Sequence, residues 1–186
     1  MSGELDTRER ILQSSLTCLH RQGFDRSNMS DIAREAGIAR PTLYKYFKNK
    51  HEVFFSAIDQ EAFTFAAAVV DHASSFNSLK DRITETIIFV VRELPQTPYL
   101  SLVLNDDMAG ALRDRAFSDE ATLIFSEMTA GPLIAINPEL NNQGIEISEI
   151  MSRFAISLIL FPGKYSQDDE NLRALIHRRI LPGLMP

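Results

Sequence analysis

The residues best suited to chemistry in this chain lie together near the N-terminus, in the run Thr42-Leu43-Tyr44-Lys45-Tyr46-Phe47. The run is dense in hydroxyl, aromatic and cationic side chains. Groups of these kinds form hydrogen bonds with the edges of bases and ion pairs with phosphates. The run therefore favours recognition of a nucleic acid, provided that a helix presents its side chains to the duplex.

Two short helical patterns meet at a glycine just before this run. Asn28 is a good N-cap for the first pattern, and Asp31 lies three residues further on, where its side chain can cap in return. Gly37 supplies the left-handed backbone that a tight exit from a helix needs. The second pattern opens at Arg40-Pro41, because proline is accepted in the first turn of a helix. Two helices joined in this way form a helix-turn-helix, whose second helix can lie in the major groove of DNA.

The helices expected on either side make the motif more specific. Residues 6–24 read as an upstream helix with Asp6 and Glu9 in capping-box positions, and another helix starts near Lys50. With these flanks, the segment from about residue 7 to residue 55 resembles the TetR family of bacterial transcriptional regulators. One departure is Ala39, which stands where a capping serine or threonine is common. The matching residues are the pair Gly23-Phe24, the stretches Asp31-Ile32-Ala33 and Ala36-Gly37-Ile38, the run Thr42-Leu43-Tyr44, Phe47 and Lys50.

The resemblance implies a fold and a function. We expect an all-α protein with a three-helix DNA-binding domain at residues 1–50 and a larger helical effector-binding and dimerisation domain at residues 51–186. We also expect a repressor that binds double-stranded DNA at a palindromic operator and is released by a small, mostly apolar ligand. The residues expected to contact DNA are Asn28, Arg40, Thr42, Tyr44, Lys45, Tyr46 and Lys50.

The distribution of charge agrees with this division. The chain has 186 residues and a net charge of −6. Residues 1–50 hold nine Lys and Arg against six Asp and Glu, a balance of +3, which leaves −9 for the rest of the chain. A basic N-terminal module joined to an acidic body suits a protein that presents one face to phosphates.

Two apolar helices close the chain. Residues 145–161 are apolar over most of the helix circumference, and residues 168–181 begin with acids and end with bases, as the helix dipole favours. Burial inside the monomer would account for such helices, but in the resembled family the last two long helices form a four-helix interface between two subunits. We therefore expect a homodimer. The residues expected at its interface are Met151, Phe154, Ile156, Leu158, Leu172, Leu175 and Ile176.

A ligand pocket is expected among the segments between the motif and those helices. Pro95 and Pro98 interrupt the helical layer and leave a place where packing can open. A filled core without a cavity is the alternative. Aromatic and flexible side chains gather in these segments, and the pocket residues expected are Phe55, Phe63, Tyr99, Met108, Phe125 and Met128.

Other classes of protein lack a supporting motif. The sequence has no nucleophile elbow, P-loop or dinucleotide-binding glycine pattern, and its four histidines are scattered, so we expect neither an enzyme nor a metal or cofactor site. Cys18 is the single cysteine, which rules out an internal disulfide. No signal-peptide pattern and no uninterrupted apolar run of membrane length is visible, so we expect a cytoplasmic protein without a membrane partner. The alternative function is a structural or partner-controlled DNA-binding protein without a small-molecule effector.

Overall fold

The computed structural model describes residues 2–97, 100, 114–115 and 118–185. Those residues form helices and turns, with no strand in the described ranges, which confirms the all-α expectation. The chain divides into two compact units, each of which is described by itself. Of the described residues, 2–62, 100 and 114–115 belong to the first unit, and 63–97 and 118–185 belong to the second.

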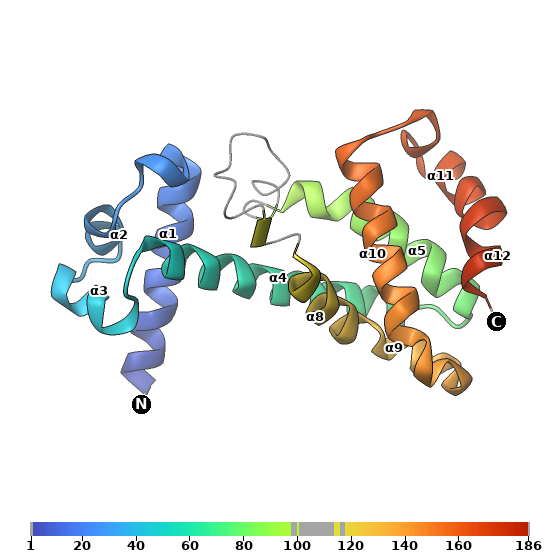
Figure 1. The fold of residues 1–186 in the computed structure, drawn as a ribbon, viewed down its shortest axis with the longest axis horizontal. Coiled ribbons are helices and arrows are strands. Elements are labelled where there is room, and N and C mark those ends of the chain that lie inside the picture. Colours follow the sequence, from blue (N-terminus) through green and yellow to red (C-terminus); the bar gives the residue numbers. More distant parts are fainter. Residues whose placement is uncertain (1, 98–99, 101–113, 116–117, 186) are drawn as a thin grey trace. The chain divides into compact units, whose positions relative to one another are not determined.

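The first unit is built from three helices and the beginning of a fourth (Figure 1). They are α1 (Ser2–Arg26), α2 (Met29–Glu35), α3 (Arg40–Tyr46) and α4 (Lys50–Ser74). Helix α2 packs against both α1 and α3. Apolar side chains at helical spacing fill the space between the helices. Those that are almost completely buried include Ile11, Leu12, Leu16, Ile32, Leu43 and Phe54.

Two residues singled out from the sequence shape the turn between α2 and α3. The Asn28 side-chain oxygen accepts hydrogen bonds from the backbone N–H groups of Ser30 at 2.9 Å and Asp31 at 3.1 Å, so Asn28 is the N-cap of α2. Gly37 has a φ of 64°, in the left-handed region that side chains disfavour. Together these two residues fix where α2 begins and how the chain turns into α3.

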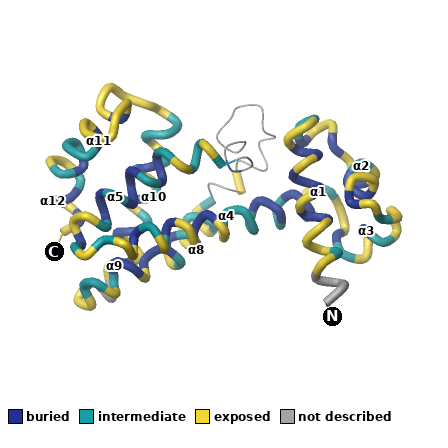
Figure 2. The backbone as a smooth tube through the Cα atoms, turned by 180° about the vertical axis from the view of Figure 1, so that it is seen from behind, coloured by how far each residue is buried: buried dark blue, intermediate teal, exposed yellow. Residues whose placement is uncertain are grey.

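Helix α4 contributes residues to both units. It is 25 residues long, and the mean hydropathy of its most apolar window is 1.4, so by length and composition it could cross a membrane. This is weak evidence, because the core helix of a globular protein passes the same test. Val53 and Phe54 in the first unit, and Ala66 and Val69 in the second, are buried within the protein. Figure 2 shows buried positions recurring along the helix.

The second unit contains six further α-helices in the described part of the chain. They are α5 (Leu79–Glu93), α8 (Asp119–Thr129), α9 (Gly131–Ile136), α10 (Gly144–Leu160) and a C-terminal pair, α11 (Asp169–Leu175) and α12 (Leu181–Leu184), joined by a π-helical turn, Ile176–Ile180. Helix α10 packs against α5, α8 and α9, and the C-terminal pair packs against α5. Short 3-10 turns lie at Leu94–Gln96, Pro138–Asn142 and Lys164–Ser166.

One local expectation was wrong in the second unit. Pro132 lies in the first turn of α9, where its missing N–H has no consequence, and residues 138–142 form a 3-10 turn. The C-terminal helix was expected to be continuous, but the π-helical turn Ile176–Ile180 interrupts it. These short elements depend on tertiary packing, which local sequence patterns do not report.

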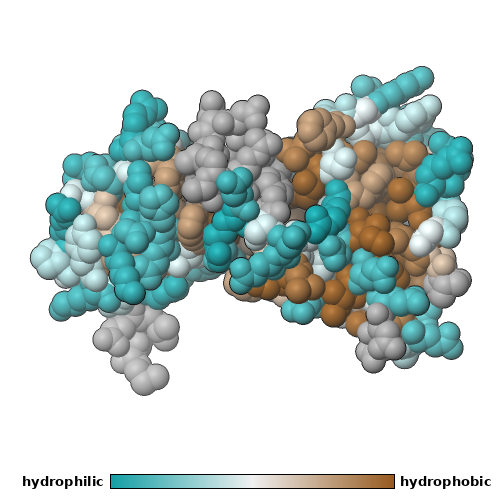
Figure 3. Space-filling view, in the orientation of Figure 1, coloured by the Kyte–Doolittle hydropathy of each residue, from teal (hydrophilic) through white to brown (hydrophobic). Residues whose placement is uncertain are grey.

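The helices expected to form a dimer interface are partly used inside the protomer. Met151, Leu172 and Ile176 are buried within the second unit. Phe154, Ile156, Leu158 and Leu175 are only half-buried. Helix α10 also exposes Ile150, and the following residue Phe161 has 76% of its surface exposed. Figure 3 shows hydrophobic surface gathered over the part of the second unit that contains α10.

Candidate nucleic-acid interface

Helix α3 turns one face to the protein and another to solvent. Leu43 is completely buried and anchors the helix in the first unit. Tyr44 and Lys45 are exposed, while Thr42 and Tyr46 are half-buried. The hydroxyl and cationic groups predicted to meet DNA are therefore on the surface or at its edge, as a helix that enters a major groove requires.

Arg40 and Tyr44, one helical turn apart on α3, form a pair. The Arg40 guanidinium donates a hydrogen bond to the Tyr44 hydroxyl at 3.2 Å. The same guanidinium lies 5.5 Å from the centre of the Tyr44 ring, a cation–π distance. Each side chain restricts the rotamers of the other. Both therefore lose less conformational entropy when they bind a partner such as DNA.

The start of α3 lacks a side-chain cap. Its N-cap residue is Ala39, whose methyl group accepts no hydrogen bond. Pro41 removes one N–H that would otherwise need a partner, and the Thr42 N–H is bonded to the Ala39 carbonyl at 2.8 Å. The departure noted at Ala39 is thus accommodated by proline and by a tight backbone turn.

An open groove of about 540 Å³ lies beside α3 in the first unit. Three of the described residues that line it, Arg40, Lys48 and Lys50, are cations, and none of the described lining residues is acidic. Asn28, Met29 and Ser30 line it from the start of α2, and Asn49 and Lys50 line it from the start of α4. Helix N-termini and cations attract anions, so the groove suits a phosphate backbone. We call these eight residues, which also include Tyr44, the N-terminal groove.

Lys50 has a structural partner as well as a place in the groove. Its ammonium donates hydrogen bonds to the backbone carbonyls of Phe24 at 3.0 Å and Asp25 at 3.3 Å. It also lies 4.5 Å from the centre of the Phe24 ring. Lys50 therefore holds the end of α1 against the start of α4. An ammonium has three donors, so one N–H is left for a phosphate.

Sequence reasoning missed part of this groove. Ser30, Lys48 and Asn49 line it although none of them was expected at the DNA. Asn49 also caps the start of α4, where its side-chain oxygen accepts the Glu52 N–H at 3.0 Å. The sequence could have indicated these three residues. Ser30 and Asn49 lie at the starts of helices, and Lys48 is a cation next to a helix start.

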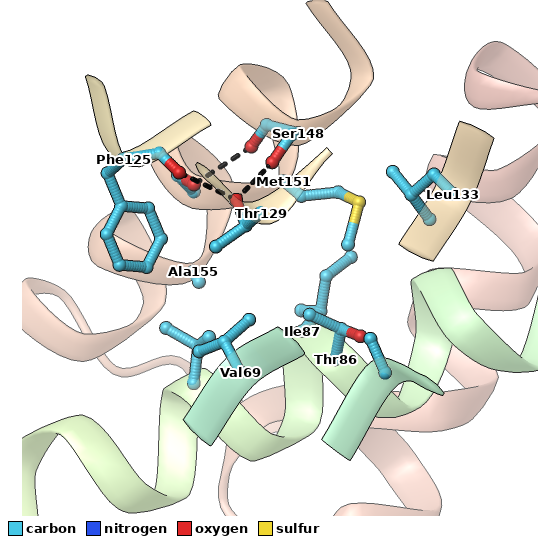
Figure 4. A pocket seen from close by; sticks show the side chains of 12 residues that line it. Val69, Thr86, Ile87, Phe125, Thr129, Leu133, Ser148, Met151 and Ala155 are labelled. Atoms are coloured by element: carbon cyan, nitrogen blue, oxygen red, sulfur yellow. Dashed lines mark hydrogen bonds between the residues drawn. The ribbon is translucent and has the colours of Figure 1, made fainter. Parts of the chain in front are cut away.

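A second candidate site is a small cavity inside the second unit (Figure 4). Its volume of about 20 Å³ accommodates roughly one water molecule. Four lining residues carry hydroxyls, Thr86, Thr129, Ser148 and Ser152, and none of the twelve lining residues is charged. We call this the second-unit cavity; its apolar lining is Val69, Ala73, Ile87, Val90, Phe125, Leu133, Met151 and Ala155.

The residues expected to line a ligand pocket are only partly gathered at this cavity. Phe125 lines it, whereas Met128 is half-buried and Phe63 is exposed without lining it. Phe55 belongs to the first unit, where the Arg115 guanidinium lies 5.5 Å from its ring centre. Tyr99 and Met108 lie outside the described residues.

The fold and the groove define a class: an all-helical protein whose first unit carries a helix-turn-helix with a cationic groove beside its second helix. Residues 11–57 match the family model described as bacterial regulatory proteins, tetR family. Over these residues the chain carries the N-terminal segment of the TetR family of regulatory proteins, the segment that contains α2 and α3.

Curated relatives and solved structures extend the likeness. An HTH-type transcriptional regulator of Mycobacterium bovis is 26% identical over 104 residues, which is 56% of this chain and 53% of that protein. A fatty acid metabolism regulator protein of Bacillus subtilis is 26% identical over 78 residues, covering 42% and 40% of the two chains. The chain thus spans about half the length of the first of these relatives. Both are regulators rather than enzymes.

Among solved structures, the TetR family repressor AlkX of Dietzia has a TM-score of 0.70 at 20% identity, covering 95% of this chain and 94% of that one. The regulator FadR of Bacillus subtilis, solved with stearoyl-CoA, has a TM-score of 0.57 at 19% identity, covering 95% and 96%. At these identities the likeness establishes a shared fold.

Proposed function

We propose that this protein is a transcriptional repressor that binds a palindromic operator as a homodimer and releases it when a small, mostly apolar molecule occupies the second unit. The observation that carries the DNA-binding part is the N-terminal groove, where three cations and two helix starts adjoin the exposed face of α3. Cations and helix starts hold phosphates, and the α3 side chains Thr42, Tyr44, Lys45 and Tyr46 read bases or adjacent phosphates. The working place of such a protein is the cytoplasm.

Dimerisation is supported by apolar side chains that the second unit leaves exposed. Ile150 and Phe161 are exposed, and Phe154 and Leu158 are half-buried. The spacing of four residues puts Ile150, Phe154 and Leu158 along one edge of α10, and Phe161 follows directly after the last residue of the helix. Two such edges from two protomers bury each other and set two α3 helices at paired half-sites of DNA.

The effector part is supported by the second-unit cavity and by the functions printed for structural neighbours. AlkX is implicated in biodegradation of n-alkanes, and FadR was solved with stearoyl-CoA. Helix α4 begins at Lys50 beside the N-terminal groove and also supplies Val69 and Ala73 to the cavity. A ligand that moves α4 therefore has a covalent route to the DNA-contacting residues.

Selection of bound duplexes from a random pool, followed by fluorescence anisotropy at several salt concentrations, tests the proposal. We expect an imperfect palindrome to be enriched and the affinity to fall steeply with salt. Lys45→Ala should weaken binding to the selected site. Glu127→Ala, at an exposed position of α8, is the control and should not weaken it. Enrichment of no sequence, with equal affinity for all duplexes, would contradict a specific operator.

The rival function is a DNA-binding protein controlled by a protein partner or acting structurally. The small size of the second-unit cavity favours it, because about 20 Å³ leaves no room for a ligand unless side chains move. Operator binding that is unaffected by any small molecule, in a protein that still selects a palindrome, would favour this rival.

A further inference from the structure

The second-unit cavity contains one hydroxyl whose hydrogen-bonding capacity is unused. Thr86 on α5 lines the cavity, only 7% of its surface is exposed, and its hydroxyl has no hydrogen-bond partner among the described residues. A threonine in a helix commonly bonds back to a carbonyl of the preceding turn. Thr129 does so, donating to the Phe125 carbonyl at 2.9 Å, but Thr86 does not. A buried hydroxyl without a partner is unfavourable, so a ligand oxygen placed beside Thr86 would gain from it.

The other three hydroxyls of the cavity already have partners. Thr129 donates to a carbonyl, so in its 2.6 Å contact with Ser148 the Ser148 hydroxyl is the donor. Ser152 donates to the Ser148 carbonyl at 2.8 Å. Figure 4 shows this bonded group across the cavity from Ile87 and Val69. Thr86 is therefore the hydroxyl of this cavity with an O–H still free to donate, whereas those of the α8–α10 group have already used theirs.

The lining also limits the charge of a ligand. All twelve lining residues are neutral, eight of them apolar. A carboxylate or phosphate in this cavity would be buried without an opposite charge, which costs far more than one hydroxyl can return. A neutral molecule with an apolar body loses only its hydration and gains contact with the lining.

We propose that the second-unit cavity binds a neutral molecule with an apolar body and a single hydroxyl or carbonyl oxygen, and that the Thr86 hydroxyl bonds this oxygen. The proposal rests on the effector function proposed above and narrows it to one chemical class. Acids and their coenzyme A esters are excluded as direct occupants of this cavity.

The ligand must also be small, because the present cavity holds about one water molecule. Met151 and Phe125 are the side chains able to enlarge it. Methionine is unbranched and adapts its shape readily, and Phe125 is only half-buried, so its ring can move toward solvent. We therefore choose a six-carbon probe, 1-hexanol, with hexanoate as its charged counterpart.

Binding is measured by NMR on protein labelled with ¹³C in the methionine methyl groups. The Met151 signal, assigned by its loss in Met151→Leu, reports directly on the cavity. We expect 1-hexanol to shift this signal in a saturable way, and hexanoate at pH 7 to bind at least tenfold more weakly. Thr86→Val should reduce the 1-hexanol affinity by about tenfold, which corresponds to 1.4 kcal/mol.

Thr84→Val is the matched control. Thr84 lies on the same helix and is buried, and its hydroxyl also has no partner within the described part of the chain, but it does not line the cavity. Its valine variant should bind 1-hexanol as the wild type does. Equal losses in the two variants would overturn the role of Thr86, and hexanoate binding as tight as that of 1-hexanol would overturn the neutral class. The absence of any saturable Met151 shift would overturn the binding site itself.

A separate measurement distinguishes this inference from the proposed function. Operator binding without ligand is recorded for each variant by anisotropy. Selective 1-hexanol binding by a protein that selects no operator would support the cavity inference while the proposed function fails. Specific operator binding by a protein that does not bind 1-hexanol would contradict the cavity inference while supporting the DNA-binding part of the proposed function.

Discussion

Lys50 combines two tasks at the junction of α1 and α4. Its ammonium bonds two carbonyls at the end of α1, and its side chain lines the N-terminal groove. Lys48 lines the same groove, but its ammonium has no hydrogen-bond partner among the described residues. The two lysines therefore allow the structural task to be separated from the electrostatic one.

We expect Lys50→Met to lower both stability and DNA affinity. Loss of the two charge-assisted hydrogen bonds should cost about 1–2 kcal/mol of unfolding free energy, reduced by partial exposure to solvent. Lys48→Met should leave thermal unfolding unchanged, yet weaken binding to every DNA sequence and lower the salt slope by about one unit. Calorimetry and salt-dependent anisotropy make the comparison. Unchanged stability of Lys50→Met would show that the carbonyl contacts contribute nothing.

Asn28 likewise caps α2 while its side chain borders the groove. Asn28→Ala should destabilise the protein by about 1 kcal/mol, since two backbone N–H groups lose their acceptor. Asn28→Asp keeps the acceptor and should retain the melting temperature. Its negative charge faces phosphate, however, so DNA affinity should fall for all sequences. An aspartate variant with normal affinity would place the phosphate elsewhere.

At the scale of elements, α1 and α4 bring the charge of Glu9 near Glu61. Glu9 accepts two hydrogen bonds from the Gln60 amide, at 2.7 and 2.8 Å. Burial raises the pKa of Glu61, and the nearby negative charge of Glu9 raises it further. A hydrogen bond with Gln13 lowers this pKa but does not cancel the rise. The folded protein therefore holds the Glu61 proton more tightly than the unfolded chain does.

The direction of this shift predicts a pH dependence. As pH rises through the raised pKa of folded Glu61, ionisation lowers the stability of the protein. Glu61→Gln should therefore raise the melting temperature at pH 7 and have little effect at pH 4. Exposed Glu127, changed to Gln in the same way, serves as the control for a general charge effect. A gain of equal size at both pH values would contradict the burial of Glu61.

The close contact between α9 and α10 depends on a glycine. A methyl group at Gly144 would lie 2.6 Å from one carbon of the Ile134 side chain and 2.9 Å from another. Gly144→Ala should cost about 1–3 kcal/mol through overpacking, whereas Gly131→Ala, with no atom within 4 Å, should be neutral or slightly stabilising. Chemical denaturation measures both. Adding Ile134→Ala should recover part of the loss, and failure to do so would rule out this clash as the cause.

At the scale of the whole molecule, the dimer is best tested at an exposed residue. Substitutions at Met151, Leu172 or Ile176 would disturb the protomer, since all three are buried in it. Ile150→Glu changes a side chain that is 42% exposed on α10, and we expect a folded monomer that has lost operator affinity. Light scattering at micromolar concentration gives the oligomeric state. Leu123→Glu, equally exposed on α8, should remain dimeric; monomeric wild-type protein would contradict the proposal.

The sequence predicted the helix-turn-helix in detail because its signals are local. Asn28 caps within three residues, and Gly37 turns the chain at one position. The Lys50 contacts were not predictable in this way, because the ammonium meets carbonyls 25 and 26 residues away. The second-unit cavity draws on five helices, and only Phe125 of the expected pocket residues reaches it. The residues that line this cavity are set by how the helices pack, and the spacing of residues in a single sequence does not show that packing.

The short length of helix α3 makes its stability depend on the rest of the first unit. It has only seven residues, fewer than an isolated helix needs to persist in water. Its hydrogen bonds therefore exist only while Leu43 stays anchored in the first unit. Amide hydrogen exchange along α3 should accordingly follow the cooperative opening of that unit rather than fraying from the helix ends. The DNA-reading surface would then appear and disappear as a whole, so that a destabilised first unit reduces the concentration of competent protein before it alters any individual contact with DNA.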